Sequence, residues 1–318
     1  MCMKKADPQA SVCVADEYGV LNETIVGKGN GFCGRTSVDY ENMMFGDTSL
    51  KSSLDSENNS LISSLESAGV KVLRPASVTS DDIRIHYGQS CLDYGFDQSF
   101  PRNNGTIIAN DLIEFEQASL RRKTDFSGLY QIFNDKSKDP NMCWYSTPHA
   151  PLLSIPDDYP LLNGNDIIFL NDRILVGIGK YTNIYGYKWL RNTFSFHDVI
   201  AIELADGVKY LSHALSVVRP GLAMICRNAL KSGIPSFMKD WKIIDISDKE
   251  RLSLVTDALP LGDNRLLIGT VRNTDISGII KALESEGISC ITVPFDAHVE
   301  LGGSVRGATF VTHRTPFE

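Results

Sequence analysis

The chain has 318 residues, of which 42% are hydrophobic and 22% are charged, as in ordinary globular proteins with a packed core. Acidic residues (39) outnumber Lys and Arg (31), the net charge is −8, and the one basic run is Arg121–Lys123. We therefore expect no nucleic-acid partner, because binding to phosphates requires a basic surface. The seven cysteines are scattered and form no C-x-x-C pair, so we also expect no disulfide framework, no metal and no cofactor.

The sequence has no apolar stretch that suggests a membrane segment. Its first residues, MCMKKADPQASV, lack the apolar core of a signal peptide, and no run reaches about 18 apolar residues. We expect a cytoplasmic protein without membrane contact. A monomer and a homo-oligomer both remain open.

Two distant segments predict the same helix-to-strand transition. Residues 61–75, LISSLESAGVKVLRP, predict the end of an amphipathic helix, a glycine and a short apolar strand. Residues 279–295, IIKALESEGISCITVPF, repeat these parts in the same order. Gly69 and Gly287 occupy the positions where a helix C-cap favours a positive φ. Looser copies of the transition are predicted at 187–204 and 237–247.

Pairs of short strands joined by tight turns also recur. The turns are Asn-Asp in 105–115 and 165–179, Arg-Pro-Gly in 216–226, and Gly-Asp-Asn in 259–269. The chain therefore contains about five strand–strand–helix–strand units. We place these units at residues 12–78, 100–150, 161–205, 210–250 and 255–314. Such a repeat predicts one domain, residues 1–318, with a circular or stacked architecture; the alternative is a generic α/β domain.

Five segments, in this order along the chain, resemble the amidinotransferase and arginine deiminase superfamily, and most of all the glycine amidinotransferases. They are ADEYGVLNETIVGKG (15–29), FPRNNGTIIANDLIE (100–114), NGNDIIFLNDRILVGIGKYTNIYGYKWLR (163–191), YLSHALSVVRPGLAM (210–224) and GGSVRGATFVTHR (302–314). The resemblance covers nearly the whole chain. It implies the pentein fold, a five-fold pseudosymmetric α/β propeller built from ββαβ units.

The resemblance also implies a chemistry for which this sequence lacks the expected residues. In the superfamily a Cys thiolate attacks the guanidinium carbon of arginine, a His moves protons, and carboxylates hold the cation. The Cys position falls on Gly307 and the His position on Tyr210. Three acidic positions fall on Asn103, Asn163 and Ser212, whereas Asp166 is retained. We therefore expect neither arginine amidinotransferase nor arginine deiminase activity, and whether the chain is an enzyme stays open.

Two alternatives would preserve part of the usual mechanism. His213 lies three residues beyond Tyr210, so a shifted register would recover the His, although residues three apart on a strand face opposite sides. Cys226 or Cys290 could act as a relocated nucleophile, although both lie in apolar runs, where core packing is favoured.

The replacements change the ligand that the site is expected to bind. Amides cannot neutralise a buried guanidinium, so we expect a neutral or anionic small molecule. Tyr210 and His298 are candidate acid–base groups, and Asn163 would orient the substrate. Further candidate substrate-binding residues are Arg102, Asn103, Asp166, Ser212, His213, Ser304, Arg306 and Gly307. We expect these residues to meet at one end of the axis and to line an open cavity.

Three functions remain open. The first is a divergent enzyme that acts on a small polar substrate, such as an amino-acid derivative or another metabolite, by acid/base chemistry without a thiol. The second is a catalytically inactive relative that binds a metabolite or a protein partner. The third is an amidinotransferase with a relocated nucleophile.

Overall fold

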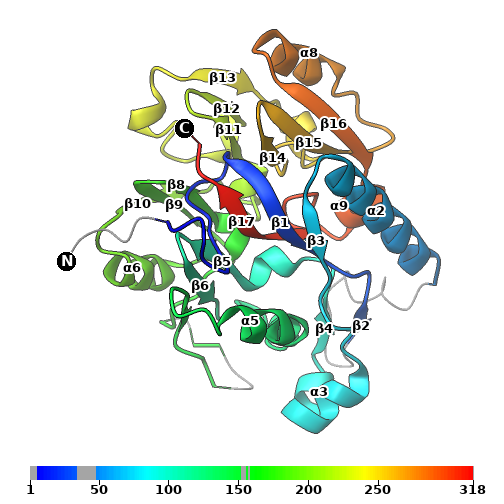
Figure 1. Ribbon diagram of the computed structural model, residues 1–318. Coiled ribbons are helices and arrows are strands. Elements are labelled where there is room, and N and C mark those ends of the chain that lie inside the picture. The colour runs from blue at the N-terminus through cyan, green and yellow to red at the C-terminus, as the bar shows by residue number, and fades with distance from the viewer. Residues whose placement is uncertain (1–5, 34–47, 152–154, 157, 318) are drawn as a thin grey trace.

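The computed structural model describes residues 6–33, 48–151, 155–156 and 158–317. Within them lie five three-stranded sheets and one two-stranded sheet (Figure 1). Each three-stranded sheet has a central strand that pairs antiparallel with one neighbour and parallel with the other. The chain is therefore a mixed α/β protein built from small sheets of one design.

The first sheet joins the two ends of the described chain. It contains β17 (Thr309–Thr315), β1 (Val20–Val26) and β3 (Lys71–Leu73). The helix α2 (Thr48–Ser67) lies between β1 and β3 in sequence. The strand predicted at the end of the 255–314 unit is β17, and it completes the sheet of the first unit by pairing with β1.

Four further sheets follow in chain order. They are β5 (Gly105–Ile108), β6 (Asp111–Glu114) and β7 (Cys143–Ser146); β8 (Ile167–Leu170), β9 (Arg173–Ile178) and β10 (Asp198–Glu203); β11 (Leu215–Arg219), β12 (Leu222–Ile225) and β13 (Lys242–Asp245); and β14 (Leu259–Gly262), β15 (Arg265–Thr270) and β16 (Ser289–Pro294). The crossover helices are α5 (Tyr130–Lys136), α6 (Ile184–Thr193) and α8 (Ser277–Ser285). In Figure 1, α2, α5, α6 and α8 lie at the periphery of the molecule.

The predicted turns and caps are confirmed. All four strand pairs form antiparallel hairpins, and Asn171, Asp263 and Asn264 adopt the positive φ that such turns require. Gly69 (φ 87°) and Gly287 (φ 79°) end their helices as expected. The segment 237–247 has a 3-10 turn, Ser236–Met238, before β13 and no α-helix.

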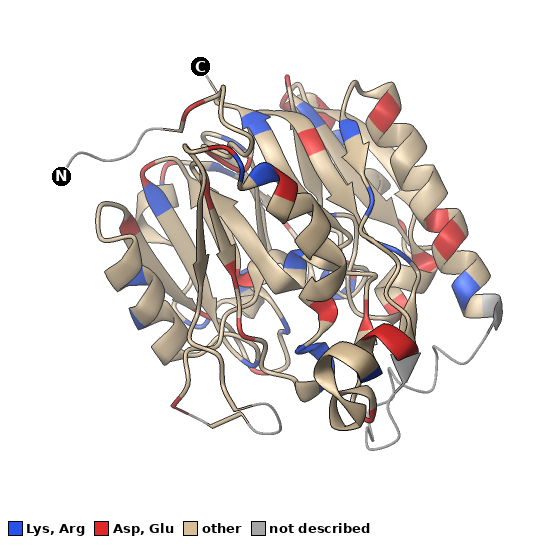
Figure 2. Ribbon diagram, turned by 60° about the horizontal axis from the view of Figure 1, so that its bottom comes forward, with Lys and Arg blue, Asp and Glu red and all other residues tan. Residues whose placement is uncertain are grey.

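The remaining elements are short. The strands β2 (Gly31–Cys33) and β4 (Gly95–Asp97) form the two-stranded sheet. The other helices are α3 (Ser80–Tyr87), α4 (Gln89–Leu92), α7 (Asp248–Arg251) and α9 (Asp296–Glu300). Among the described residues, no helix combines the length and apolarity needed to cross a lipid bilayer. Figure 2 shows basic and acidic residues interspersed over the ribbon.

A turn precedes the first strand of each sheet, and these turns position the candidate site. The turns before β5, β8 and β11 are 3-10 segments, Pro101–Asn104, Gly164–Asp166 and Leu211–His213. The turns before β14 and β17 contain Asp257 and Gly307. The strands that follow are almost wholly buried, so each turn sits on a rigid support.

Candidate functional site

Four amide side chains form a buried ring that links two of these turns. Asn165 Nδ2 donates to Asn103 Oδ1 at 2.9 Å, and Asn165 N donates to Asn163 Oδ1 at 2.9 Å. Gln117 closes the ring, because its Oε1 accepts from Asn163 Nδ2 at 3.4 Å and its Nε2 donates to the Asn103 carbonyl at 2.6 Å. All four side chains are buried. The ring is uncharged, so it can bind carbonyl and amino groups but cannot neutralise a cation.

Gly307 lies between this ring and a buried carboxylate, Asp257. A Cβ on Gly307 would lie 3.5 Å from Asn165 Nδ2 and 3.2 Å from Asp257 Oδ2. The Asp257 Oδ2 accepts from Ser304 N at 2.8 Å and from Gly307 N at 3.3 Å. A thiol at position 307 would face this carboxylate, and a neighbouring negative charge raises the pKa of a thiol. The surroundings of Gly307 therefore disfavour the thiolate that the usual mechanism needs.

Several buried polar atoms near this point have no hydrogen-bond partner among the described residues. They are Ser212 Oγ, His213 Nε2, Thr256 Oγ1, Asp257 Oδ1 and Ser304 Oγ. They come from the turns that precede β11, β14 and β17. Because each unpaired buried polar group costs roughly 1–3 kcal/mol, such a group suggests a place where a ligand or water binds.

Burial and nearby charges set the protonation of the titratable groups here. Burial lowers the pKa of His213 to about 4, although the charge of Asp257 opposes this shift. The imidazole is therefore neutral at pH 7 and has a free lone pair. Burial raises the pKa of Asp166 to about 7, while its hydrogen bonds from Thr182 Oγ1 (2.7 Å) and Leu211 N (2.8 Å) act in the opposite direction.

Tyr210 packs between aromatic neighbours. Its ring centroid lies 5.1 Å from that of His213, edge to face, and 5.0 Å from that of Tyr181. The hydrogen bond from Leu211 N to Asp166 ties the Tyr210 turn to the turn that contains Asn163. The structure therefore brings Asn103, Asn163 and Gly307 together, with Tyr210 on the adjoining turn.

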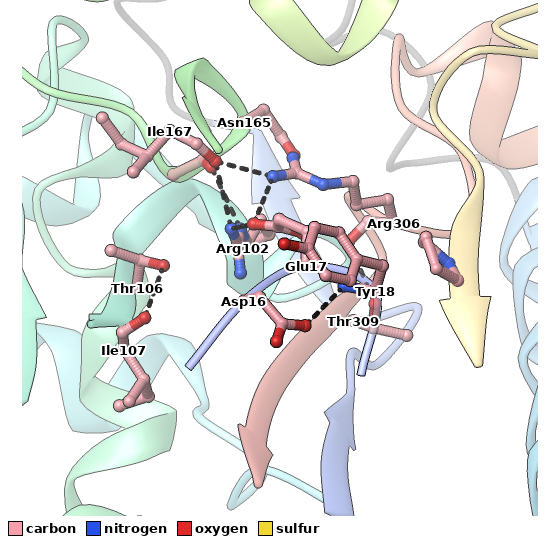
Figure 3. Close-up of polar contacts among 12 residues, drawn as sticks. Asp16, Glu17, Tyr18, Arg102, Thr106, Ile107, Asn165, Ile167, Arg306 and Thr309 are labelled. Atoms are coloured by element: carbon pink, nitrogen blue, oxygen red, sulfur yellow. Dashed lines mark hydrogen bonds and ion pairs between the residues drawn. The ribbon is translucent and has the colours of Figure 1, made fainter. Parts of the chain in front are cut away.

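The two arginines predicted to bind a ligand are held by Glu17. Arg102 Nη2 donates to Glu17 Oε1 at 2.8 Å, and Arg306 Nη2 donates to the same atom at 3.1 Å (Figure 3). Both also donate to the Ile167 carbonyl. Burial alone would raise the pKa of Glu17, but the charges of Arg306 and Arg102 lower it to about 2. Both guanidinium groups are thus neutralised within the protein.

His298 lies in α9 and is fully buried. Its Nδ1 lies 2.7 Å from Glu57 Oε2 of α2, and its ring stacks on Phe295 with a centroid distance of 4.3 Å. Glu57 also accepts from the backbone N–H groups of Ala297 and His298. These contacts give His298 a clear role in docking α9 against α2. Its Nε2 has no partner among the described residues.

The thiols proposed as relocated nucleophiles are poorly suited to that role. Burial raises the pKa of Cys226, whose Sγ lies 3.5 Å from Asp248 Oδ1, and burial raises that of Cys290 to about 11. Neither sulfur is a thiolate at neutral pH. Within the described part of the chain, no group of three or more His, Cys, Asp or Glu side chains could hold a metal ion.

A cavity of about 580 Å³ lies beside the Tyr210 turn and is lined by Gly179, Asp206, Val208 and Lys209, among others. Its lining does not include the predicted site residues. That Tyr210, Asn163, Asn103 and Arg306 or His298 line an open cavity therefore stays a prediction.

Sequence reasoning missed Glu17, Gln117, Asn165 and Asp257. A comparison of the repeat units would have identified Asp257, because Asp166, His213 and Asp257 occupy the same place before their strands. In each case the backbone N–H donates to the residue three positions earlier, namely Asn163, Tyr210 and Leu254. Glu17 and Gln117 lie outside these turns, and only the folded structure brings them into contact with the site.

The sequence has few detectable relatives. No protein-family model matches it. The uncharacterized protein YkgA of Bacillus subtilis (strain 168) is 22% identical over 149 residues, which cover 46% of this chain and 51% of that protein. The match therefore spans only about half the length of this curated relative.

Solved structures resemble the whole chain. SxtG, an amidinotransferase from Microseira wollei in the saxitoxin biosynthetic pathway, superposes with a TM-score of 0.82, 20% identity and coverage of 97% of this chain and 98% of its own. Inosamine-phosphate amidinotransferase StrB1 from Streptomyces griseus gives 0.80, 18%, 97% and 98%. The Pseudomonas aeruginosa DDAH in complex with citrulline gives 0.68, 12%, 92% and 99%. At these identities the likeness shows the fold, which confirms the resemblance found in the sequence.

Proposed function

Because the chain has the fold of the amidinotransferases and the arginine-deiminase-type pentein enzymes, we propose that it is a divergent enzyme of this superfamily that uses no thiol nucleophile. It acts on a small, neutral, polar metabolite by acid/base chemistry. The observation that carries the proposal is Asp257, a buried carboxylate with one unpaired oxygen, placed beside Gly307.

The charge balance of the site favours a neutral substrate. The cations Arg102 and Arg306 are already paired with Glu17. The amide ring of Asn103, Gln117, Asn163 and Asn165 adds no charge. A guanidinium substrate would find only Asp257 as a partner, whereas the resemblance implies several carboxylates around it. Loss of the arginine activities is therefore part of the proposal.

The residues divide between proton transfer and orientation. Asp257 Oδ1 and His213 Nε2 are both unpaired and can accept a proton at neutral pH. Asn103 and Asn163 orient the carbonyl or amino groups of the substrate, and Ser212 and Ser304 add hydroxyl groups. Tyr210 packs on His213 and positions its imidazole. In this scheme Asp257 and His213 have the acid–base role that was expected of Tyr210 and His298.

The proposal includes the finer architecture. The five three-stranded sheets share one strand order, and the pairing of β17 with β1 completes the first of them. These features support a pseudo-fivefold propeller in a single domain. A cytoplasmic location and a small-molecule partner, expected from the sequence, belong to the same proposal.

The test combines ligand screening with two matched variants. The wild type, Asp257→Asn and Asp206→Asn are screened by thermal unfolding against neutral and anionic metabolites, and each stabilising compound is followed by mass spectrometry for conversion. A ligand at about 100 times its Kd adds about 2.7 kcal/mol of stability. We expect conversion by the wild type and by the exposed-site control Asp206→Asn, and none by Asp257→Asn. Equal conversion by Asp257→Asn would overturn the proposed mechanism.

One observation favours the second function, a catalytically inactive binding protein. The amide ring and the Glu17 network use many of their polar groups on one another, as in a packed structural core. In that case a metabolite would stabilise the wild type and Asp257→Asn, and neither would convert it. Conversion that is lost in Cys226→Ala or Cys290→Ala would instead support the relocated nucleophile.

A further inference from the structure

A second cavity, of about 620 Å³, lies away from the amide ring. Its walls come from the segment between β1 and β2, from α2, and from the loop between β3 and α3. The charged residues in its lining are Lys28, Lys51, Arg74 and Asp55. None of the residues assigned to the candidate site above lines it.

The cavity has an excess of positive charge. Lys51 pairs with Asp55 at 2.8 Å, which uses the single carboxylate of the lining. Arg74 makes no hydrogen bond to any described residue, and its Nη1 is buried. Lys28 Nζ donates only to a neutral oxygen, Ser77 Oγ, at 2.7 Å. The cavity therefore holds two cations, Lys28 and Arg74, without an anionic partner.

The two cations act on each other. Burial and the charge of Arg74 lower the pKa of Lys28. Burial also lowers the pKa of Arg74, which the charge of Asp55 opposes. Two buried like charges destabilise a protein unless an anion binds between them. A ligand with several acceptor oxygens would remove this cost, because guanidinium and ammonium groups both donate strongly to phosphate.

The loop that forms one wall is held in place. The buried Gln98 accepts from Val78 N at 3.1 Å and from Asn30 Nδ2 at 2.8 Å, and it donates to the Ala76 carbonyl at 2.8 Å. On the opposite wall, a Cβ on Gly29 would lie 2.8 Å from Leu54 Cβ of α2. The cavity is thus preformed, with the Ser77 and Thr79 hydroxyls on its loop side.

We propose that this cavity binds a phosphate-bearing metabolite, with Lys28 and Arg74 holding the phosphate oxygens. Ser77 provides a hydroxyl to the same group. Lys51 stays with Asp55 and contributes only long-range attraction. The site does not depend on the function proposed for the amide-lined centre.

The test uses inorganic phosphate and glycerol 3-phosphate as probes, titrated at constant ionic strength and followed by calorimetry and 31P NMR. We expect saturable binding that weakens at least tenfold in Arg74→Gln and in Lys28→Gln. The control Lys231→Gln, which removes a lysine paired with Asp206 in another cavity, should bind as the wild type does. Tighter binding of glycerol 3-phosphate than of phosphate would identify a phosphate ester as the ligand. Preference for free phosphate would restrict the proposal to the inorganic ion.

Absence of saturable binding of both probes by the wild type would overturn the proposal, as would unchanged binding by Arg74→Gln. The thermal midpoint without phosphate gives a second readout. Removing an unpaired buried charge should leave Arg74→Gln at least as stable as the wild type in phosphate-free buffer. A large loss of stability there would show that Arg74 is held by protein contacts, which also contradicts the proposal.

Discussion

Replacement of Glu17 by Gln should destabilise the fold strongly. Glu17 Oε1 accepts hydrogen bonds from Arg102 and Arg306, and all three side chains are buried. The glutamine would leave two buried guanidinium charges without a counter-charge. Breaking such a pair typically costs about 3–5 kcal/mol. The exposed Glu66→Gln variant is the matched control.

The pKa of Glu17 gives an independent estimate of the same quantity. A fall from 4.5 to about 2 corresponds to about 3.4 kcal/mol at about 1.36 kcal/mol per pKa unit. Because the pKa is lower in the folded state, this stability is present above pH 4.5 and is lost as the pH falls toward 2. For a chain of this length, about 3.4 kcal/mol lowers Tm by about 5 °C.

Denaturant unfolding at pH 7 and at several values between 4.5 and 2.5 would measure the effect. We expect Glu17→Gln to lose about 3 kcal/mol at pH 7, and the difference from the wild type to shrink as the pH falls. A loss below about 0.5 kcal/mol, typical of a surface change, would refute the reasoning. A difference that does not change with pH would show that packing, and not charge, makes Glu17 important.

Three further predictions concern the site and the turns. Gly307→Cys should not gain arginine activity, and its thiol should react slowly with iodoacetamide at pH 7, because its Cβ would lie 3.2 Å from Asp257 Oδ2; rapid alkylation would contradict this. His213, with its pKa lowered to about 4, should make the wild type lose stability as the pH falls from 6.5 to 4, and His213→Asn should flatten that slope in urea titrations. Asn171 has φ 64°, so Asn171→Val should cost about 1–2 kcal/mol in thermal unfolding and Asn171→Gly almost nothing; equal stability of the two would be inconsistent with the turn geometry.

Local signals in the sequence were sufficient to predict the fold. Turn residues such as Asn171 and Gly221, and helix caps such as Gly69, act over a few neighbours, so their roles can be recognised without the structure. Recurrence of the same pattern gave the sheet design. The exchange of β17 into the first sheet is a contact between distant segments, which periodicity does not report.

The candidate site was only partly predictable, for the same reason. Asn103, Asn163 and Gly307 lie in turns that the resemblance aligns, and the structure brings them together. Their charge environment depends on Glu17 and Asp257, which are distant in sequence from the residues that they contact. The arginines expected to attract an anion are neutralised by one of these acids. Pairing of charges between distant segments is thus the information that sequence reasoning lacked.

The strand β17 also has a consequence for how the chain acquires its structure during synthesis. Val20 pairs with Thr315, whereas the other four three-stranded sheets each pair strands from one contiguous segment. On the ribosome those four sheets can form in order as they emerge, but β1 must wait for the last strand. Its long contact order predicts a slow final step in which an exposed edge of β1 is open to mispairing. The first segment to be synthesised is therefore the last to be secured.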